Sequence, residues 1–475
     1  MNPDINALVD AHQGRGWELF GRYVNPQLAC VVKTIGFSRN YVKASGPYLY
    51  DEQGNEYLDF LAGYGVFNMG RNNKTIKEEL HKALDGEWPN MVQMDTPLLA
   101  GLLAERLLSV VNDKTNHDPR STNHDYLDMV FFTNSGTEAN EGAIKFARKA
   151  TGRARILSWE HAFHGLTTGS LALNGNVEFR KGFGDLLPGC QAIPFNDLSA
   201  LENELRKKDV AAFVIEPVQG KGVYVADPQF YTEAQSLCRR YGTLFVIDEV
   251  QTGFGRTGKW FAHHHWGLTP DIVTVAKALS GGYVPVGAIC YRRGIYDKVF
   301  TDMEHCVVHS NTFGRNVLAM TAGLAAIDVM EKENVVENAA RIGEKIKNGL
   351  REMAPRYEMI KEVRGLGLMI GIEFGEPKSF SLRAGWKILH AVNKGLFGQM
   401  VVVPLMCDHK ILTQVAGHNV DIVKLLPPLI INEAHAERFL SAFDSVMKEC
   451  HRFPGNAWTI GKKLAAEAIR AKQAI

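Results

Sequence analysis

Short apolar runs rich in β-branched residues are the most regular pattern along the chain. Two of them, Leu244 to Ile247 and Ile272 to Ala276, each end at a single charged residue, Asp248 and Lys277. Runs of this length and composition predict strands buried on both faces of a parallel sheet. Because the carboxyl ends of parallel strands meet along one edge, we expect Asp248 and Lys277 to lie at one shared site.

Strand and helix patterns alternate through the middle of the chain. Apolar runs that predict buried strands end at Phe132, near Trp159 and at Glu216. After the first of these runs, alanines recur every three or four residues from 139 to 150, which predicts a helix with a narrow apolar face.

The two ends of the chain have other patterns. The stretch around 51–56 predicts a β-hairpin with a glycine-containing turn, and 75–113 predicts two helices. The polar stretch 115–125 is longer than compact domains need and is interpreted as a surface insertion. A long helical stretch over 320–353 is followed by segments that predict strands, VVVPL at 401–405 among them, and then by an amphipathic helix and a helical tail.

Composition excludes several classes of protein. Of 475 residues, 45% are apolar and 22% charged, which is ordinary for a soluble enzyme. The net charge of +1 gives no field that would attract nucleic acid or an anionic membrane. Seven unevenly spaced cysteines do not predict a disulfide framework. With no apolar run near the ~20 residues of a membrane span and no signal-peptide pattern, we expect a cytoplasmic protein.

A lysine at the end of a buried strand can be a desolvated amine that forms a Schiff base with an aldehyde. Pyridoxal 5'-phosphate (PLP) needs such a lysine, a carboxylate at its ring nitrogen and a phosphate site. An ion pair between Asp248 and that nitrogen at about 4 Å, with an effective dielectric of about 20, contributes roughly 4 kcal/mol and keeps the nitrogen protonated. Taken alone, Asp248 also fits a turn or helix cap, and Lys277 a surface group.

The segment from Ser135 to Thr137 lies between a predicted strand and a predicted helix. Ser135 and Glu138 have the spacing of a capping box. Free backbone N–H groups at a helix start, with the two hydroxyls of this segment, suit a phosphate. In isolation, an ordinary helix cap explains these residues equally well.

IDEVQTGFGRTGK at 247–259, followed by PDIVTVAKALSGGYVPVGA at 270–288, closely resembles the cofactor region of class III (omega) aminotransferases, which are PLP enzymes of fold type I. Five segments agree in order and spacing. The resemblance covers the chain from about Tyr41 to Met447.

The resemblance implies an α/β fold of two domains. A large domain is built on a mostly parallel seven-stranded sheet, and a smaller domain is α+β. Residues 1–94 would form an N-terminal arm and part of the small domain. Residues 95–330 would form the large PLP-binding domain, and 331–475 the C-terminal small domain with its helical tail.

The resemblance also implies roles for individual residues. Asp248 pairs with the ring nitrogen, Gln251 with the ring hydroxyl, and Lys277 forms the Schiff base. Phe163, in an aromatic-His-Gly motif, stacks on the ring, and the SGTEA motif from Ser135 binds the phosphate. The implied cofactor-binding residues are Ser135, Gly136, Thr137, Phe163, His164, Glu216, Asp248, Gln251, Lys277 and Thr312, with Lys277 and Asp248 catalytic and no metal ligand.

HSNTFGRN at 309–316 resembles the segment that these enzymes extend across a dimer interface, where a threonine hydroxyl binds the neighbour's PLP phosphate. Thr312 is the candidate for that role, and a site completed by the neighbour implies an obligate homodimer. Tyr64 falls where ornithine-type members carry an entrance tyrosine. A tyrosine packed on a surface loop explains it equally well.

Two candidate substrate residues depart from the family pattern. Many members have a glutamate after EPVQG and an arginine before a later Pro-Pro that binds the keto acid's α-carboxylate, where this chain has Lys221 and Lys424. Lysine lacks arginine's bidentate fork, and two lysines cannot form the family's salt-bridged gate. The hypothesis is a ping-pong transaminase with a keto acid or aldehyde acceptor, acting on an amino group remote from any carboxylate: in a diamine, an ω-amino acid, or a long or hydrophobic amine.

Three other functions fit parts of the sequence. The same fold could run another PLP reaction, as an aminomutase, racemase or decarboxylase. Gly253, Gly255 and Gly258 spell GxGxxG, which would suggest a nicotinamide-dependent reductase, but no convincing helix follows. A non-catalytic interaction protein on this scaffold would bind PLP weakly. His263 to His265 do not predict a metal site, because three consecutive side chains cannot all face one ion.

Overall fold

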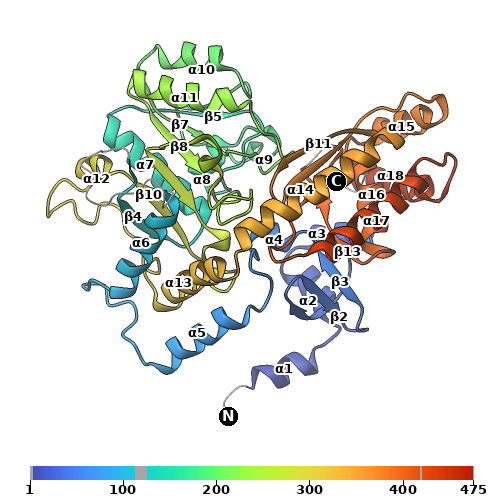
Figure 1. The fold of residues 1–475 in the computed structure, drawn as a ribbon, viewed down its shortest axis with the longest axis horizontal. Helices are drawn as coiled ribbons and strands as arrows, with labels where there is room; N and C mark the ends of the chain where they lie inside the picture. The colour runs from blue at the N-terminus through green and yellow to red at the C-terminus, as the bar shows by residue number, and fades with distance from the viewer. Residues whose placement is uncertain (1–3, 113–125, 418–419, 474–475) are drawn as a thin grey trace.

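A mostly parallel seven-stranded sheet forms the larger of the two lobes in Figure 1. The computed structural model describes residues 4–112, 126–417 and 420–473, so the interpreted insertion at 115–125 lies outside the described residues. The strand order is β4–β10–β9–β8–β7–β5–β6, with only β10 antiparallel to its neighbours. The strands are β4 (Met129–Thr133), β5 (Arg155–Trp159), β6 (Cys190–Ile193), β7 (Val210–Ile215), β8 (Leu244–Asp248), β9 (Ile272–Val275) and β10 (Gly287–Tyr291).

The apolar runs correctly predicted β4, β5, β7, β8 and β9, and the resemblance implied the seven-stranded, mostly parallel sheet. Every residue of β7, β9 and β10 is buried, as expected for strands covered on both faces by helices. The helices of this lobe are α5 (Lys74–Asp85), α6 (Leu98–Val111), α7 (Gly136–Thr151), α8 (Thr168–Leu173), α9 (Val177–Arg180), α10 (Leu198–Leu205), α11 (Pro228–Tyr241), α12 (Arg293–Val299) and α13 (Val317–Lys332), with 3-10 turns η1 (Ala262–Trp266) and η2 (Lys277–Ser280).

Helix α7 lies against β10, β9 and β7. Its predicted stripe, Ala139, Ala143, Ala147 and Ala150, is buried along its whole length. Small side chains are required there, since a Cβ on Gly142 would lie 2.3 Å from Ile289 of β10. This close packing fixes the start of α7 at the carboxyl edge of the sheet.

The smaller lobe combines segments from both ends of the chain (Figure 1). Its antiparallel sheet has the order β11–β12–β15–β14, and a second sheet has the order β1–β2–β3–β13, with β13 parallel to β3. The strands are β1 (Tyr41–Ser45), β2 (Tyr48–Asp51), β3 (Glu56–Asp59), β11 (Ile360–Leu366), β12 (Met369–Phe374), β13 (Ile411–Leu412), β14 (Gln414–Val415) and β15 (Ile422–Leu425). The hairpin expected around 51–56 is β2–β3. The boundaries 1–94, 95–330 and 331–475 remain a prediction.

Helices cover these two sheets. They are the short α4 (Ala62–Gly65), α14 (Val335–Met353), α15 (Phe380–Val392), α16 (Leu396–Cys407), α17 (Glu433–Cys450) and α18 (Asn456–Gln473), with a 3-10 turn η3 (Ala354–Arg356). The helical stretch expected over 320–353 consists of two helices, α13 and α14. Asn334 separates them with a φ of 50°, which breaks the right-handed helix.

The strand prediction for VVVPL at 401–405 is wrong. These residues form the centre of α16. Its residues Val401, Val402, Pro404 and Leu405 are buried. A short apolar run has no polar face to reveal its period, so a helix that is enclosed on most sides gives the same pattern as a buried strand.

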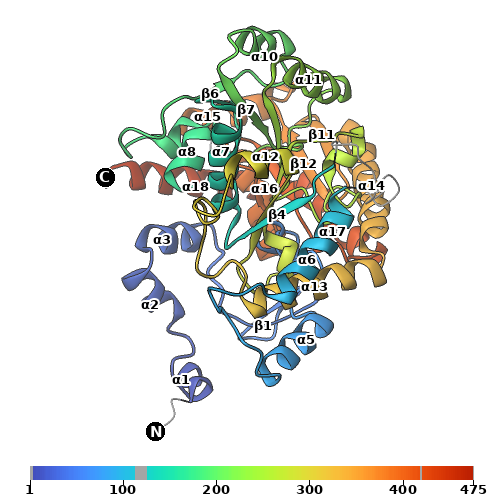
Figure 2. The ribbon, with the colours of Figure 1, turned by 90° about the vertical axis from the view of Figure 1, so that its left-hand side faces the viewer.

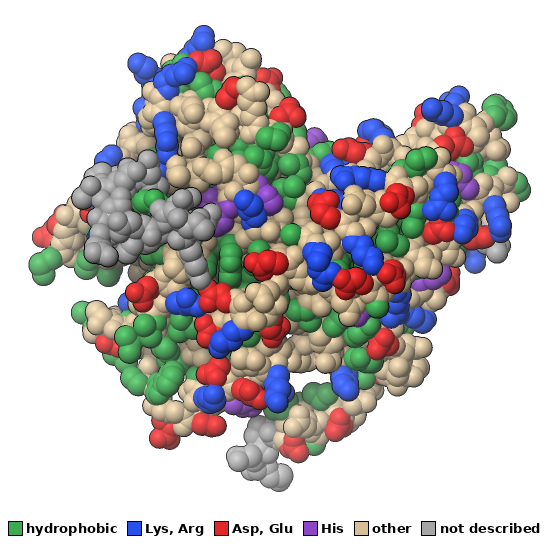
Figure 3. Space-filling model, viewed as in Figure 1, with side chains coloured by type: hydrophobic (Ala, Val, Ile, Leu, Met, Phe, Trp, Pro, Cys, Tyr) green, Lys and Arg blue, Asp and Glu red, His purple; other side chains and the backbone are tan. Residues whose placement is uncertain are grey.

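The first three helices are α1 (Ile5–Ala11), α2 (Gly16–Tyr23) and α3 (Pro26–Thr34), and none of them contains a buried residue. In Figures 1 and 2, α1 extends away from the body of the molecule. Figure 3 shows acidic and basic side chains interspersed over one face. Within the described ranges, no single helix has the length and apolar character of a membrane span. Helices α15 and α16 reach that length and apolar character only when they are counted together, and they are bent by 101° relative to each other.

Candidate active site

The ends of several strands meet at one cavity of about 950 Å³. Asp248 ends β8, Lys277 follows β9 by two residues, and Glu216 directly follows β7. Of the predicted site residues, all except Thr312 line this cavity: Tyr64, Ser135, Gly136, Thr137, Phe163, His164, Glu216, Lys221, Asp248, Gln251, Lys277 and Lys424. The sequence therefore located the cavity, while the roles of its residues remain predictions.

Lys277 lies at the start of the 3-10 turn η2, with a φ of 48°. A positive φ is strained for a residue with a side chain and is held only by the surrounding structure. Burial lowers the pKa of Lys277, although the nearby carboxylates of Asp248 and Glu216 act in the opposite direction. A lysine with a lowered pKa supplies the neutral amine that nucleophilic and base chemistry require.

Asp248 is buried and held by three donors. One carboxylate oxygen, Oδ2, accepts from Asn140 Nδ2 at 2.7 Å and from His164 Nδ1 at 2.8 Å. The other oxygen accepts from the Val250 N–H at 3.0 Å. These contacts fix the orientation of the carboxylate in the cavity wall, so that it can face a cationic ring without moving.

His164 lies beside Asp248 as an orienting partner. Burial alone would lower the pKa of His164, but the hydrogen bond and the charge of Asp248 raise it. Its Nε2 is buried and has no hydrogen-bond partner among the described residues. Since Nδ1 donates to the carboxylate, the imidazole helps to hold Asp248 in its orientation.

Asn140 is a residue that the sequence analysis missed. Its amide donates to Asp248 and to the His164 carbonyl, both at 2.7 Å, and its Oδ1 accepts from Thr274 of β9 at 2.8 Å. The sequence signal that could have identified Asn140 is its position among the alanines on the buried face of α7. A buried amide on such a face needs hydrogen-bond partners, and the functional residues at the strand ends supply them.

The start of α7 has the geometry expected of an anion site. Ser135 caps the helix, with its Oγ accepting from the Glu138 N–H at 3.2 Å. The first N–H groups of a helix have no partner within the helix and can point at an anion. A Cβ on Gly136 would lie 2.7 Å from Val250, so glycine is required here. The Thr137 hydroxyl contacts the hydroxyls of Thr167 and Ser170, at 2.7 and 2.8 Å.

A second group of polar residues also lines the cavity. Glu216 accepts from the N–H groups of Phe163 and Gly220, at 2.9 and 2.8 Å, and burial raises its pKa. Lys424 donates to the Gly220 carbonyl at 2.6 Å, and Gln251 Oε1 lies 3.4 Å from the same ammonium. Burial, reinforced by the charge of Lys277, lowers the pKa of Lys424 to about 7.

The GxGxxG sequence is a packing element. Arg256, which follows its second glycine, is fully buried and donates to the carbonyls of Leu368 and Pro427 and to Asn68 Oδ1. A Cβ on Gly258 would lie 2.9 Å from Ala340 of α14. Close approach between the lobes therefore explains this motif without a dinucleotide.

The three consecutive histidines lie away from the cavity. His263 is buried, with Nδ1 2.9 Å from Glu249 Oε1, and both His263 and His264 direct Nε2 at the carbonyl of Val111. No group of three potential metal-ligating side chains occurs among the residues that the structure describes.

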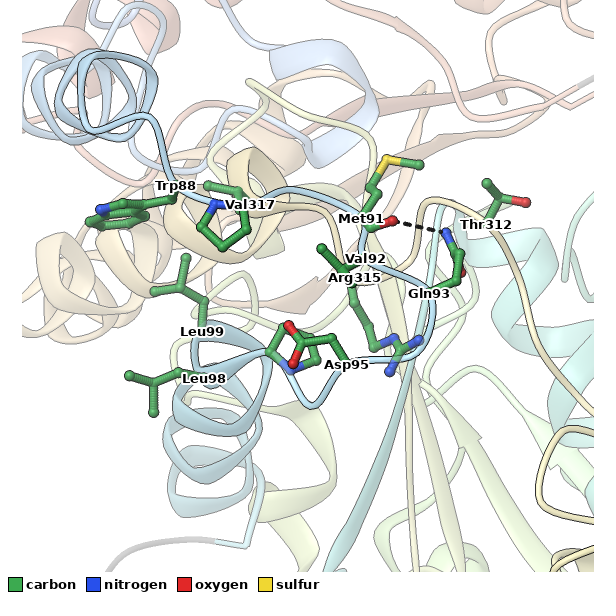
Figure 4. Close-up of a pocket in the computed structure, with 12 residues that line it drawn as sticks. Trp88, Met91, Val92, Gln93, Asp95, Leu98, Leu99, Thr312, Arg315 and Val317 are labelled. Carbon is green, nitrogen blue, oxygen red and sulfur yellow. Dashed lines mark hydrogen bonds between the residues drawn. The ribbon is translucent and has the colours of Figure 1, made fainter.

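The residues of the cavity fit PLP. Lys277, Asp248 and the start of α7 meet the three needs of that cofactor, which are an amine, a carboxylate and a phosphate site. Phe163 contributes a flat apolar face to the same cavity. The remaining predicted residue, Thr312, lines a separate cavity of about 300 Å³ together with Arg315, Trp88 and Met91 (Figure 4).

Comparison with known proteins gives one consistent result. A family model described as class-III aminotransferase matches residues 32–447. Aminotransferase PigE of Serratia sp. (strain ATCC 39006) is 33% identical over 94% of this chain, which spans only 55% of that protein. Putrescine aminotransferase of Pectobacterium atrosepticum is 35% identical, over 90% of this chain and 88% of the relative. A solved ornithine aminotransferase from Toxoplasma gondii, with PLP at partial occupancy, matches 95% of this chain and all of its own with a TM-score of 0.78 and 26% identity.

Proposed function

The chain belongs to the class-III aminotransferases, which are PLP-dependent enzymes, and from this premise we propose the roles of its residues and its substrates. The donor is an amine or ω-amino compound and the acceptor a keto acid or aldehyde. The two bind in turn at the same cavity in a ping-pong reaction. The observation that carries the proposal is that Lys277, Asp248 and the start of α7 line one cavity.

Ser135, Gly136 and Thr137 would hold the cofactor's phosphate, Phe163 would cover its ring, and Lys277 would hold its aldehyde carbon covalently through Nζ. The bound cofactor supplies a protonated ring that accepts the electron pair left when a proton leaves the substrate carbon. Asp248 keeps that ring protonated, and Asn140 and His164 orient Asp248.

Lys277 moves the proton. Once a substrate amine had displaced Nζ from the cofactor, burial, which lowers the pKa of Lys277, would favour the neutral form of its amine. That amine would take the proton from the substrate carbon that bears the amino group and deliver it to the cofactor's aldehyde carbon, and with the acceptor it would carry a proton the opposite way. Gln251, fixed by its bond to the Tyr64 carbonyl at 3.0 Å and by Lys424, would bind the ring hydroxyl, with Glu216 behind it.

We propose an obligate homodimer in which Thr312 binds the phosphate of the neighbour's cofactor. Thr312 does not line the cavity of its own chain. Two large apolar side chains in adjoining positions are exposed: Met94, between the cavity-lining residues Gln93 and Asp95, at 98%, and Phe313, next to Thr312, at 57%. Exposed apolar surface of this extent is typical of an interface. The extended α1 to α3 arm would contribute to the same contact.

Tyr64, Lys221 and Lys424 would contact the substrate. Lys424 is more deeply buried than Lys221. Burial, together with the nearby charge of Lys277, lowers the pKa of Lys424. A lysine provides a point charge without arginine's paired donors, so it holds an α-carboxylate less firmly. This supports donors whose amino group is remote from a carboxylate. We place the protein in the cytoplasm, a proposal supported by seven unpaired cysteines.

The visible spectrum of the purified protein tests the proposal. Amine donors should shift the cofactor's absorbance, and a keto acid should restore it. Borohydride should fix the cofactor to Lys277, and the Lys277→Ala variant should lose turnover. Normal turnover by that variant, or a reduced protein without modification at this side chain, would overturn the assignment.

A further inference from the structure

An ion pair that the sequence did not predict involves one of the lysines that line the cavity. Lys221 Nζ lies 3.0 Å from Glu178 Oε1. Glu178 belongs to the single turn α9, whereas Lys221 follows β7, and 43 residues separate them along the chain. Lys221 lines the cavity together with Phe179, the neighbour of Glu178.

Lys221 is held in place by its surroundings. Its ammonium lies 4.4 Å from the centre of the Phe179 ring, a cation–π contact. A Cβ on Gly417 would lie 3.1 Å from its Cε, so the stem is confined on that side. The Phe179 ring in turn meets Phe163 edge to face, with centroids 5.6 Å apart. The cation is thereby connected to the residue expected to cover the cofactor ring.

The two partners differ in exposure. The Lys221 side chain is 16% exposed and that of Glu178 is 41% exposed. Water can therefore solvate Glu178 when the pair separates, whereas Lys221 remains against Phe179 and needs another anion. A carboxylate on an entering substrate can replace Glu178 at lower cost than an ammonium can replace Lys221.

We propose that Glu178 and Lys221 form a substrate-selective gate, in which Lys221 exchanges Glu178 for a carboxylate at the end of the substrate remote from the reacting carbon. This inference rests on the proposed function and narrows its donor class. ω-Amino acids are favoured over diamines, because a diamine's far ammonium is repelled by Lys221. Glu178 competes with the substrate carboxylate for the same cation.

A matched series of donors tests the gate. Four- to six-carbon ω-amino acids are compared with the α,ω-diamines and simple n-alkylamines of equal length, using the full-length holoenzyme and pyruvate. In the unaltered enzyme, kcat/KM should be highest for an ω-amino acid. Glu178→Gln should lower KM for ω-amino acids about threefold, the value of an exposed ion pair, because the competitor has gone. Lys221→Gln should raise that KM about tenfold, through loss of a charge-assisted hydrogen bond.

Glu160→Gln is the control. It removes a carboxylate from an exposed residue whose backbone carbonyl accepts from Gln219, close to the loop of Lys221. It should change the donor ranking by less than the Glu178 substitution does. A structural role for the pair would change kcat/KM equally for the carboxylate, ammonium and alkyl donors, and that result would overturn the proposal. A diamine preference in the unaltered enzyme that is lost in Glu178→Gln would also overturn it.

Calorimetric titration with glutarate, which has no amine to react, gives a second measurement. Its affinity should rise about threefold in Glu178→Gln and fall about tenfold in Lys221→Gln. If no donor changes the cofactor's absorbance, the proposed function fails, but the glutarate affinities still decide the gate. Equal glutarate affinities in all three proteins would exclude it.

Discussion

Asp248→Asn isolates the charge of the carboxylate from its shape. The substitution removes the anion that would face the ring nitrogen. At about 4 Å and an effective dielectric of about 20, that ion pair contributes roughly 4 kcal/mol, or about three pKa units. A ring that is largely unprotonated accepts electrons poorly. We expect the rate of the amine half-reaction to fall about 10³-fold, with little change in the amount of cofactor bound.

The surrounding hydrogen bonds set the cost to stability. Oδ2 of Asp248 accepts from both Asn140 and His164, so a new amide nitrogen there would face two donors. His164 can relieve one conflict by moving its proton from Nδ1 to Nε2, which has no hydrogen-bond partner among the described residues. The other conflict remains and should cost about 1–3 kcal/mol of unfolding free energy.

Stopped-flow absorbance with a saturating amine measures the rate, and thermal unfolding measures the stability. Thr274→Val is the matched control, because it removes the bond to Asn140 Oδ1 without changing a charge. We expect its rate to stay within tenfold of the unaltered enzyme. If Asp248→Asn holds PLP and also stays within tenfold, the electrostatic role assigned to this carboxylate is refuted.

Three further predictions concern the interface, the phosphate site and a buried ion pair. Thr312→Ala should lose activity. Co-expression of this variant with Lys277→Ala should restore part of the activity, because one of the two sites in each mixed dimer then carries neither substitution. If the mixed dimers show no recovery, Thr312 does not act on the neighbour's site. Gly136→Ala should weaken PLP affinity at least tenfold, because the new Cβ would lie 2.7 Å from Val250, and equilibrium dialysis measures this loss. Burial opposes ionisation of Glu249, but its hydrogen bonds with His263 and Thr252 and its electrostatic attraction to His263 together outweigh burial and lower its pKa. The stability from this carboxylate is therefore present above its unfolded pKa near 4.5 and lost as pH falls below it, so an acid unfolding curve for Glu249→Gln should be flatter than that of the unaltered protein.

Local sequence determined the parts of the site that depend on one segment at a time. The strand ends at Asp248 and Lys277 follow from apolar runs that are too uniform to tolerate exposure. The start of α7 follows from a capping residue next to a glycine. These patterns are short-range, so the chain specifies them before it folds, and the family motifs assign chemistry to them.

Tertiary structure decided what depends on residues that are distant along the chain. The run at 401–405 is a helix enclosed by neighbouring elements. The apolar pattern of the run could not distinguish such a helix from a buried strand. Asn140 acquired its role only when α7 packed beside β8 and β9. Lys221 pairs with Glu178 across 43 residues, although the sequence predicted only that Lys221 and Lys424 could not form the family's salt-bridged gate. A charge shows its sign in the sequence, but its partner is set by how the loops converge, and those contacts exist only in the folded chain.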